Sequence, residues 1–327
     1  MKRKSTALLA AAGFALTFAS SAMSFELNGK VDCIAPSDPG GGWDFTCRSV
    51  GRILQELDMV PQGVQTMNMP GATGGVAYAH VISKRPEDEQ LLVAASTVTS
   101  AGLAQGLFQG MTADQVNWVA ALGADYGVIA VPKDSEFKTL DDLTAALKKD
   151  PRSVIFAGGD AKRSWDHLKA LMFADKAGVE DLSQVRYLAY EGGGEALTQV
   201  VGGHVDVFSG DISEAKGFRE SGDLRILALL SDERLEGELA DIPTAKEQGI
   251  DVLAPNWRGF YIPPNVSDEA KQFWISTIQE LSQTDEWKQA MESNGLMPFN
   301  LKGEKFEQFV LDQVKDIETL SKRMGTG

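Results

Sequence analysis

One short pattern, an apolar strand followed by a glycine loop and a helix, occurs twice near the start of this chain. The first copy has the strand Val31–Ala35, the glycines at 40–42 and a helix whose N-cap is expected at Asp44. The second copy has a strand at 64–69 and a glycine-rich loop at 70–75. Strands that alternate with helices predict an α/β fold with a mainly parallel sheet and with ligands beyond the carboxyl ends of its strands.

These loops suit the binding of an anion. Glycine has no Cβ, so its backbone turns tightly and approaches a ligand closely. The first N–H groups of the following helix have no partner within the helix and carry its positive dipole end. A tight strand-to-helix turn without any ligand is the alternative interpretation, and a single glycine loop is compatible with both.

The same alternation continues along the chain. A third strand at 91–95 runs into a polar turn at 96–100. A second unit is then expected, with strands at 126–131, 154–157, 185–190, 205–209 and 224–230. At 254–262 the chain is expected to return to the first unit, and three helices finish it, at 268–283, 285–294 and 305–324.

The first 24 residues have the pattern of a secretory signal peptide. Three basic residues precede an apolar run at 7–19, and small residues follow at 20–22. Cleavage is expected after Ala22 or Ser24. No cysteine stands there to carry a lipid, and no later stretch has the apolar length of a membrane span. The sequence therefore predicts an exported, periplasmic protein.

The charge of the chain without this leader is strongly negative. It has 28 Lys and Arg (31 less the 3 in the leader) against 46 Asp and Glu, a net charge of −18. Such a surface argues against nucleic acid and anionic membranes as partners. A small anion remains compatible, because a closed site acts through local dipoles rather than through net charge.

The two cysteines, Cys33 and Cys47, both lie in the opening pattern. In an exported protein such a pair predicts a disulfide, here between the first strand and the following helix. Closing this loop contributes about 3 kcal/mol in the chain-entropy model. A redox-active pair and a metal site are the alternatives, but there is no C-x-x-C spacing and no histidine cluster.

Common enzyme signatures are missing from the sequence. It contains no G-x-S-x-G elbow, no phosphate-binding P-loop and no G-x-G-x-x-G fingerprint. The histidines, His80, His167 and His204, are not at metal-ligand spacing. Asp160 and Asp211 could act as a general acid and base, although capping a helix or binding a ligand hydroxyl suits them better. We therefore expect no enzyme activity, no cofactor and no metal ion.

Seven motifs together identify a family resemblance that extends over essentially the whole chain after the leader. They are CIAPSDPGGGWDFTC (33–47), MPGATGGVAY (69–78), DYGVIAV (125–131), YEGGGE (190–195), FSGD (208–211), IPTAKEQG (242–249) and RGFY (258–261). With these motifs the chain resembles the periplasmic solute-binding proteins of the tripartite tricarboxylate transporters, in particular the citrate-binding type.

The resemblance implies a two-lobed, Venus-flytrap binding protein of type II with two hinge crossovers. Lobe 1 would hold residues 25–124 and 255–327, and lobe 2 residues 125–254. The protein would act as a monomer that captures a small di- or tricarboxylate between the lobes and delivers it to membrane permease subunits. Presentation of the carboxylate to a membrane sensor kinase is one alternative, and an exported hydrolase is another.

The resemblance also implies a set of ligand-binding residues on both lobes. In lobe 1 and on the returning strand they are Gly40, Gly41, Gly42, Trp43, Asp44, Thr73, Gly74, Ser96 and Arg258. In lobe 2 they are Lys162, Arg163, Ser164, Gly193, Gly194 and Asp211. Lys162 and Arg163 depart from the small residues that the family has in this loop. They are expected to meet the distal carboxylates of the ligand, and the alternative is that they are solvated surface charges.

Overall fold

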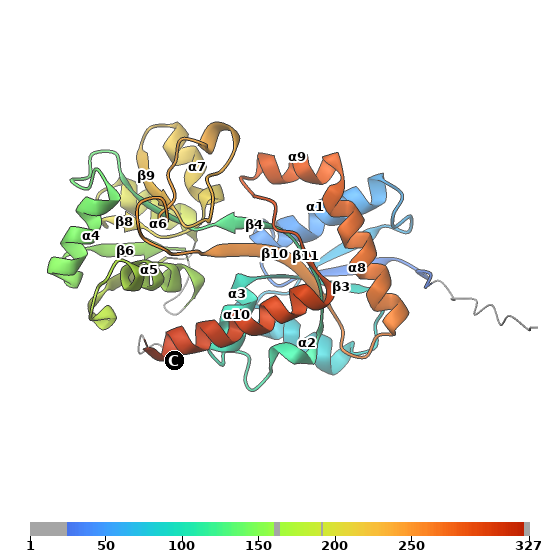
Figure 1. The fold of residues 1–327 in the computed structure, drawn as a ribbon. Helices are drawn as coiled ribbons and strands as arrows, with labels where there is room; N and C mark the ends of the chain where they lie inside the picture. The colour runs from blue at the N-terminus through green and yellow to red at the C-terminus, as the bar shows by residue number, and fades with distance from the viewer. Residues whose placement is uncertain (1–24, 160–163, 191, 324–327) are drawn as a thin grey trace, which may run out of the picture.

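The protein has two mixed β-sheets, each covered by helices on both faces, as the computed structural model in Figure 1 shows. The structure describes residues 25–159, 164–190 and 192–323. The predicted signal peptide and the loop at 160–163, with Asp160, Lys162 and Arg163, lie outside these residues.

The first sheet is built from both ends of the chain. Its strands are β1 (Val31–Ala35), β2 (Val64–Asn68), β3 (Leu91–Ser96), β4 (Asn117–Tyr126), β10 (Pro255–Ile262) and β11 (Leu301–Lys302). Their order in space is β11-β4-β10-β3-β1-β2. Its helices are α1 (Gly42–Glu56), α2 (Gly75–Lys84), α3 (Thr97–Ala104), α8 (Asp268–Gln283), α9 (Asp285–Ser293) and α10 (Gly303–Arg323).

The second sheet uses the middle of the chain. Its strands are β5 (Val128–Pro132), β6 (Ile155–Gly158), β7 (Arg186–Ala189), β8 (Val207–Phe208) and β9 (Leu224–Leu229), in the order β7-β6-β8-β5-β9. Its helices are α4 (Leu140–Lys149), α5 (Trp165–Lys176), α6 (Gly193–Val201) and α7 (Ile212–Glu220). Short 3₁₀ turns are η1 (Ala72–Gly74), η2 (Ala113–Gln115), η3 (Pro151–Ser153), η4 (Leu182–Gln184) and η5 (Gly237–Leu239).

Side chains alternate between the two faces of each sheet, so each sheet has two apolar cores. In β1, Cys33 packs beneath α1, α8 and α9, whereas Ile34 packs on the side of α2 and α10. In β5, Val128 packs with α6 and α7, whereas Ile129 packs with α4 and α5. Burial on both faces explains why these strands read as continuous apolar runs.

The prediction of a mainly parallel sheet is wrong, because both sheets are mixed. β1 is parallel to β2 and β3, but β10 is antiparallel to β3 and β4. Likewise β6 is parallel to β7 and β8, while β5 is antiparallel to β8 and β9. In each sheet, the strand that follows a crossover, β5 in the second sheet and β10 in the first, runs antiparallel to both of its neighbours.

β4 and β10 form the connection between the two sheets (Figure 1). They pair over their whole length, and at the second sheet this ladder ends with Tyr126 opposite Pro255. The α/β, two-lobed architecture with two crossovers confirms the predicted fold class. The exact lobe boundaries, after residues 124 and 254, remain a prediction.

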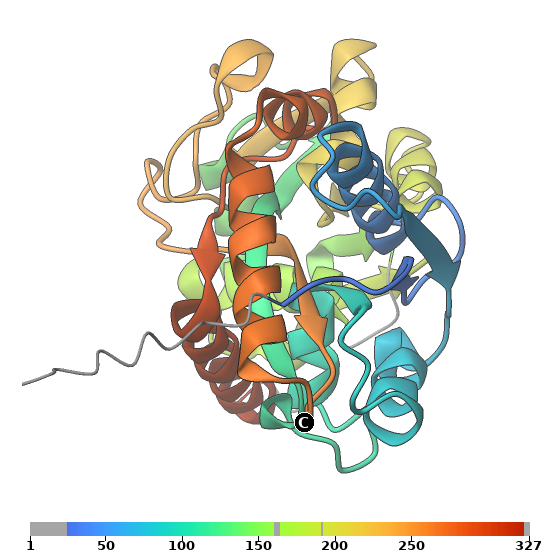
Figure 2. The same cartoon turned by 90° about the vertical axis from the view of Figure 1, so that its right-hand side faces the viewer.

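The two lobes also share an apolar contact, which we call the interlobe seam. The core beneath α4 and α5 includes Ala101 from α3 and Ile317 from α10, and Val98 and Leu320 pack against it. α10 extends from the first lobe toward the second in Figure 1, and Figure 2 views the molecule from the side of the first lobe. None of the helices in the described part of the chain has the length and hydrophobicity that a membrane crossing requires.

Candidate functional site

The predicted site residues lie mainly in the first turns of helices that follow the carboxyl ends of strands. α1 follows β1, α3 follows β3, α5 follows β6, α6 follows β7 and α7 follows β8. The two glycine loops and Ser96 belong to the first lobe, and Ser164, Gly193, Gly194 and Asp211 belong to the second. Arg258 is on β10, the strand that returns to the first lobe, and pairs in register with Ser96 of β3.

Arg258 lies against the first turn of α1. A Cβ atom added to Gly42 would be 2.8 Å from Nη1 of Arg258, so glycine is required for this approach. The Arg258 side chain is only 13% exposed, and its ion-pair partner among the described residues is Asp125, whose Oδ2 is 3.6 Å from Nη2. None of the five N–H donors of its guanidinium group has a hydrogen-bond acceptor among the described residues. A charged donor group thus lies beside the N-terminus of α1.

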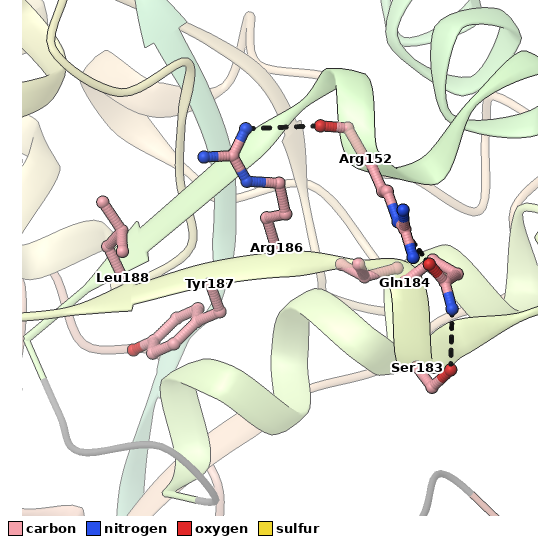
Figure 3. A pocket seen from close by; sticks show the side chains of 7 residues that line it. Arg152, Ser183, Gln184, Arg186, Tyr187 and Leu188 are labelled. Atoms are coloured by element: carbon pink, nitrogen blue, oxygen red, sulfur yellow. Dashed lines mark hydrogen bonds between the residues drawn. The ribbon is translucent and has the colours of Figure 1, made fainter.

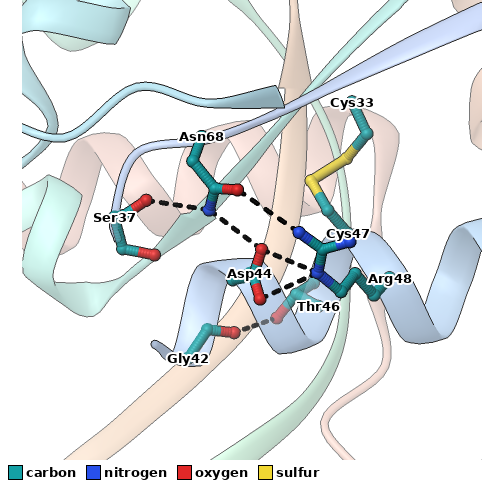
Figure 4. The surroundings of a disulfide bond; sticks show 8 residues. All are labelled: Cys33, Ser37, Gly42, Asp44, Thr46, Cys47, Arg48 and Asn68. Atoms are coloured by element: carbon teal, nitrogen blue, oxygen red, sulfur yellow. Dashed lines mark hydrogen bonds and ion pairs between the residues drawn. A yellow bond between two sulfur atoms is a disulfide. The ribbon is translucent and has the colours of Figure 1, made fainter. Parts of the chain in front are cut away.

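Asp44 has a structural role in the glycine loop rather than the expected N-cap role. α1 begins at Gly42 with Gly41 as its N-cap, so Asp44 is the third helical residue. Its carboxylate accepts hydrogen bonds from the Gly40 N–H, from Nε of Arg48 and from Nδ2 of Asn68, each at 2.9 Å (Figure 4). The bond from Arg48, with those from Gly40 and Asn68, outweighs burial and lowers the pKa of Asp44 to about 2.

The predicted disulfide is present in the structure. Cys33 in β1 and Cys47 in α1 are bonded, with their Cα atoms 5.7 Å apart (Figure 4). Both residues are buried in the core beneath α1. The bridge therefore holds the first turns of α1 to the strand that precedes the glycine loop.

The second glycine loop has an unusual backbone. Residues 71 to 74 all have positive φ, including Ala72 at 47° and Thr73 at 56°. A Cβ atom on Gly74 would lie 3.5 Å from the ring of Trp43, so the two glycine loops meet here. The indole Nε1 of Trp43 is buried without a partner among the described residues. Backbone strain of this kind is concentrated at ligand-binding loops.

The second lobe contributes a buried group of charges around Lys169. Its side chain is 0% exposed, and its Nζ lies 2.8 Å from Oδ1 of Asp166 and 2.5 Å from Oδ1 of Asp211. Burial alone would lower the pKa of Lys169, but the two carboxylates outweigh it and raise the pKa above its ordinary value. Lys169 is therefore a permanent cation that neutralises part of this acidic group.

Glu214 occupies the helix N-terminus at which Gly193 was expected to bind ligand. A Cβ atom on Gly193 would lie 2.2 Å from Oε1 of Glu214, so this carboxyl group already fills the first turn of α6. Glu214 also accepts a hydrogen bond from the Asp211 N–H at 3.2 Å, as part of the capping box of α7. Burial, followed by the charges of Asp166 and Asp211, raises the pKa of Glu214. Gly194, by contrast, has open space around it.

Two contacts join this group to the strands that cross between the lobes. Nδ2 of Asn256, on β10, donates to Oδ2 of Asp211 at 2.6 Å. Asp125, near the end of β4, accepts hydrogen bonds from the N–H of Ser213, at 3.2 Å, and from its hydroxyl group. The structure thus connects Gly42, Arg258 and Asp211, three of the predicted residues, through Asp125 and Asn256.

Other predicted residues are not part of this network. Ser96 caps α3 through a bond from the Val98 N–H, so the expected polar turn at 96–100 is the start of a helix. The Ser164 hydroxyl is buried without a partner among the described residues. The residues of this buried polar network that sequence reasoning missed are Asp125, Asp166, Lys169, Glu214 and Asn256. Only Asp125 had a sequence signal, since it begins one of the family motifs.

Two surface cavities lie elsewhere and contain no predicted site residue. One, of about 410 Å³, is at the edge of the second sheet around η4 and β7. Figure 3 shows the side chains that line it, which are those of Arg152, Ser183, Gln184, Val185, Arg186, Tyr187 and Leu188. The other, of about 510 Å³, follows β5 and includes Asp206 and Asp223. Within the described residues no group of three or more His, Cys, Asp and Glu side chains could hold a metal ion.

Comparison with known proteins identifies the family. Residues 51–326 match the family model described as "Tripartite tricarboxylate transporter family receptor". The chain is 28% identical to BugT of Bordetella pertussis over 294 residues, which cover 87% of this chain and 86% of that protein.

Two solved structures from Rhodopseudomonas palustris have the same fold. MatC with bound malate matches with a TM-score of 0.73 and 19% identity, covering 90% of this chain and 99% of that chain. Rpa4515 with adipate matches with a TM-score of 0.77 and 20% identity, covering 91% and 98%. By its sequence this chain belongs to the tripartite tricarboxylate transporter receptor family, and it is accordingly a solute-binding receptor and not an enzyme.

Proposed function

We propose that this protein binds a small di- or tricarboxylate between its two lobes. The observation that carries the proposal is the Arg258 guanidinium, which faces the first turn of α1 without a hydrogen-bonding partner among the described residues. A buried guanidinium whose donors lack hydrogen-bond acceptors is costly, and a carboxylate is the group that matches its planar donors. The two relatives solved with malate and adipate support this class of ligand.

One carboxylate of the ligand would lie between Arg258 and the N–H groups at the start of α1. The glycine loop lets the backbone approach the ligand there, and Gly42 leaves the space that Arg258 occupies. The rest of the ligand would extend toward the open space at Gly194 and the Ser164 hydroxyl of the second lobe. Lys162 and Arg163, outside the described residues, would meet further carboxylates, as a citrate-like ligand requires.

The same proposal includes the cellular role of the protein. A signal peptide over residues 1–24 would direct it to the periplasm, where it would act as a monomer. The liganded protein would then deliver the carboxylate to the membrane subunits of a tripartite tricarboxylate transporter, in keeping with the family to which the chain belongs.

Calorimetry with malate, adipate and citrate tests the proposed carboxylate site. We expect the wild-type protein to bind at least one of these anions and Arg258→Gln to bind it about 10- to 100-fold more weakly. This range corresponds to a charged hydrogen bond that contributes about 1.5–3 kcal/mol. The matched control is Arg52→Gln, since Arg52 is an exposed residue of α1 that pairs with Glu56. Equal affinity of Arg258→Gln and wild type would contradict the assignment.

A further inference from the structure

Asp125 is a buried carboxylate that the proposed binding of an anion does not itself use. Its side chain is 1% exposed, and Nη2 of Arg258 lies 3.6 Å from its Oδ2. On its other side it accepts two hydrogen bonds from Ser213, which lies in the first turn of α7. Asp125 is therefore held firmly by the second lobe and only loosely by Arg258.

This arrangement leaves Arg258 shared between two anionic positions. One is the Asp125 carboxylate, and the other is the position beside Gly42 at the start of α1. A distance of 3.6 Å is an ion pair without a hydrogen bond, so Arg258 loses little when a ligand carboxylate takes its donors. Two carboxylates competing for one guanidinium are most stable when one of them is protonated.

We propose that Asp125 is the internal counter-ion of Arg258, and that it takes up a proton from solvent when a ligand carboxylate binds to Arg258. The proposal rests on the proposed carboxylate site and makes Asp125 a positioning residue, which acts on the ligand through Arg258. In the free protein the Asp125 carboxylate balances the guanidinium. In the complex the ligand supplies that charge. The protonated Asp125 still accepts the Ser213 N–H at Oδ1, while its Oδ2 carries the proton and donates it to the Ser213 hydroxyl oxygen.

Several charged groups surround Asp125 and affect its proton. Arg258 approaches from β10, and Asp211 and Glu214 belong to the first turn of α7. Lys169 and Asp166, from α5, lie behind Asp211. Burial and the charge of Asp211 raise the pKa of Asp125 to about 7, while Arg258 lowers it. The pKa of Asp125 is thus close to neutral pH, where a ligand carboxylate that balances the charge of Arg258 changes the protonation of Asp125.

The direction of the pH dependence follows from this balance. A neighbouring opposite charge lowers the pKa of a carboxyl group by about 1–3, so neutralising Arg258 with a ligand raises the pKa of Asp125 by part of that amount. Binding then favours the protonated form. Affinity is constant below the pKa of the free protein, about 7, and falls as the pH rises above it. We expect a loss of about tenfold up to about pH 9.

Calorimetry of the full-length protein with malate tests the proton uptake. Wild type should take up about half a proton per malate bound between about pH 7 and about pH 8, measured in two buffers of different ionisation enthalpy. Asp125→Asn should bind malate as tightly at about pH 9 as wild type does below about pH 7 and should take up no proton. If Asp125 had only a structural role, Asp125→Asn would bind malate more weakly than wild type. Weaker binding, or unchanged proton uptake, by Asp125→Asn overturns the proposal.

Glu214→Gln provides the matched comparison, because Glu214 is the other acid of this group with a raised pKa, but it faces Gly193 rather than Arg258. It should still take up the proton on binding malate. Loss of proton uptake in Glu214→Gln with retention in Asp125→Asn would assign the proton to Glu214 instead.

A measurement on the free protein separates this proposal from the proposed carboxylate site. ¹³C NMR titration of the Asp125 carboxyl group in wild type and Arg258→Gln needs no ligand. The pKa of Asp125 should be higher in the variant, because its counter-ion is gone. An unchanged pKa overturns the proposal even if malate binds. Failure to bind malate together with a raised pKa would instead contradict malate as the ligand and support the ion pair.

Discussion

At the scale of single residues, Asp44, which the sequence predicts as a ligand-binding residue, holds the first glycine loop in place through its own hydrogen bonds. Its carboxylate accepts hydrogen bonds from Arg48, Gly40 and Asn68, and these bonds lower its pKa to about 2. A carboxylate with a lowered pKa stabilises the fold above its unfolded pKa, 3.8, and this stabilisation is lost as the pH falls toward about 2.

Asp44→Asn should therefore lower the free energy of unfolding at neutral pH by about 1.5–3 kcal/mol, the contribution of hydrogen bonds to a charged group. The variant should also lose less stability than wild type between about pH 4 and about pH 2. Urea unfolding across this pH range measures both effects. Asp38→Asn, at an exposed position in the same loop, is the control. Parallel pH profiles of wild type and Asp44→Asn would refute the role of this carboxylate.

Sequence reasoning found the residues that a local motif marks and missed those that act through distant partners. Gly42 and Arg258 stand in recognisable motifs, and the structure places them in contact. Lys169 has no such signal, because its partner Asp211 is 42 residues away in the sequence. The pairing of distant charges depends on how strands are ordered in a sheet, and no local spacing encodes that order.

At the scale of elements, the second glycine loop has the most strained backbone in the described part of the chain. Four successive residues, from Gly71 to Gly74, have positive φ, a region that costs an L-residue about 1–2 kcal/mol. Glycine at the first and last positions carries this conformation freely, but Ala72 and Thr73 do not. The fold tolerates the cost because the loop must begin α2 beside Trp43.

Ala72→Gly should consequently raise the free energy of unfolding by about 0.5–1 kcal/mol, since it relieves this conformation at an exposed position. Ala79→Gly, the control, lies within α2, where glycine should cost about 1 kcal/mol. Thermal denaturation of the two variants should give shifts of opposite sign. A lower melting temperature for Ala72→Gly would show that its backbone is not strained.

The strands also show where pattern reading succeeds. β1, β3 and β9 are short apolar runs bounded by polar residues, and their predicted positions agree with the structure to within a residue. β4 was missed over residues 117–125, because its alanines and glycine have low strand propensity. Its place between β10 and β11, rather than its own sequence, makes it a strand.

At the scale of the whole molecule, the interlobe seam couples two units that the topology would otherwise join only by β4 and β10. Ile317 of α10 and Ala101 of α3 complete the core beneath α4 and α5. The second lobe therefore buries part of its apolar surface against helices of the first. A rotation of the lobes that keeps this apolar surface buried must move α3 and α10 along α4 and α5.

Ile317→Ala should lower the free energy of unfolding by about 2–5 kcal/mol, as expected for truncation of a buried isoleucine. Because the seam belongs to both lobes, amide hydrogen exchange should become faster in α5 as well as in α10. Asp316→Ala, at the adjacent exposed position, should change stability by no more than about 0.5 kcal/mol. Faster exchange confined to α10 would mean that the seam does not connect the lobes.

The pairing of Tyr126 with Pro255 has a consequence for how such a protein can be altered or inherited. Because the chain leaves and rejoins the first sheet at neighbouring positions, the residues between them form one continuous segment whose two ends lie side by side. A gene segment that encodes these residues can be exchanged between relatives as one unit, because both of its junctions lie in the β4–β10 ladder. If the ligand binds between the lobes as proposed, each exchange would combine the first lobe with a different second lobe, and recombination could thereby change the ligand specificity.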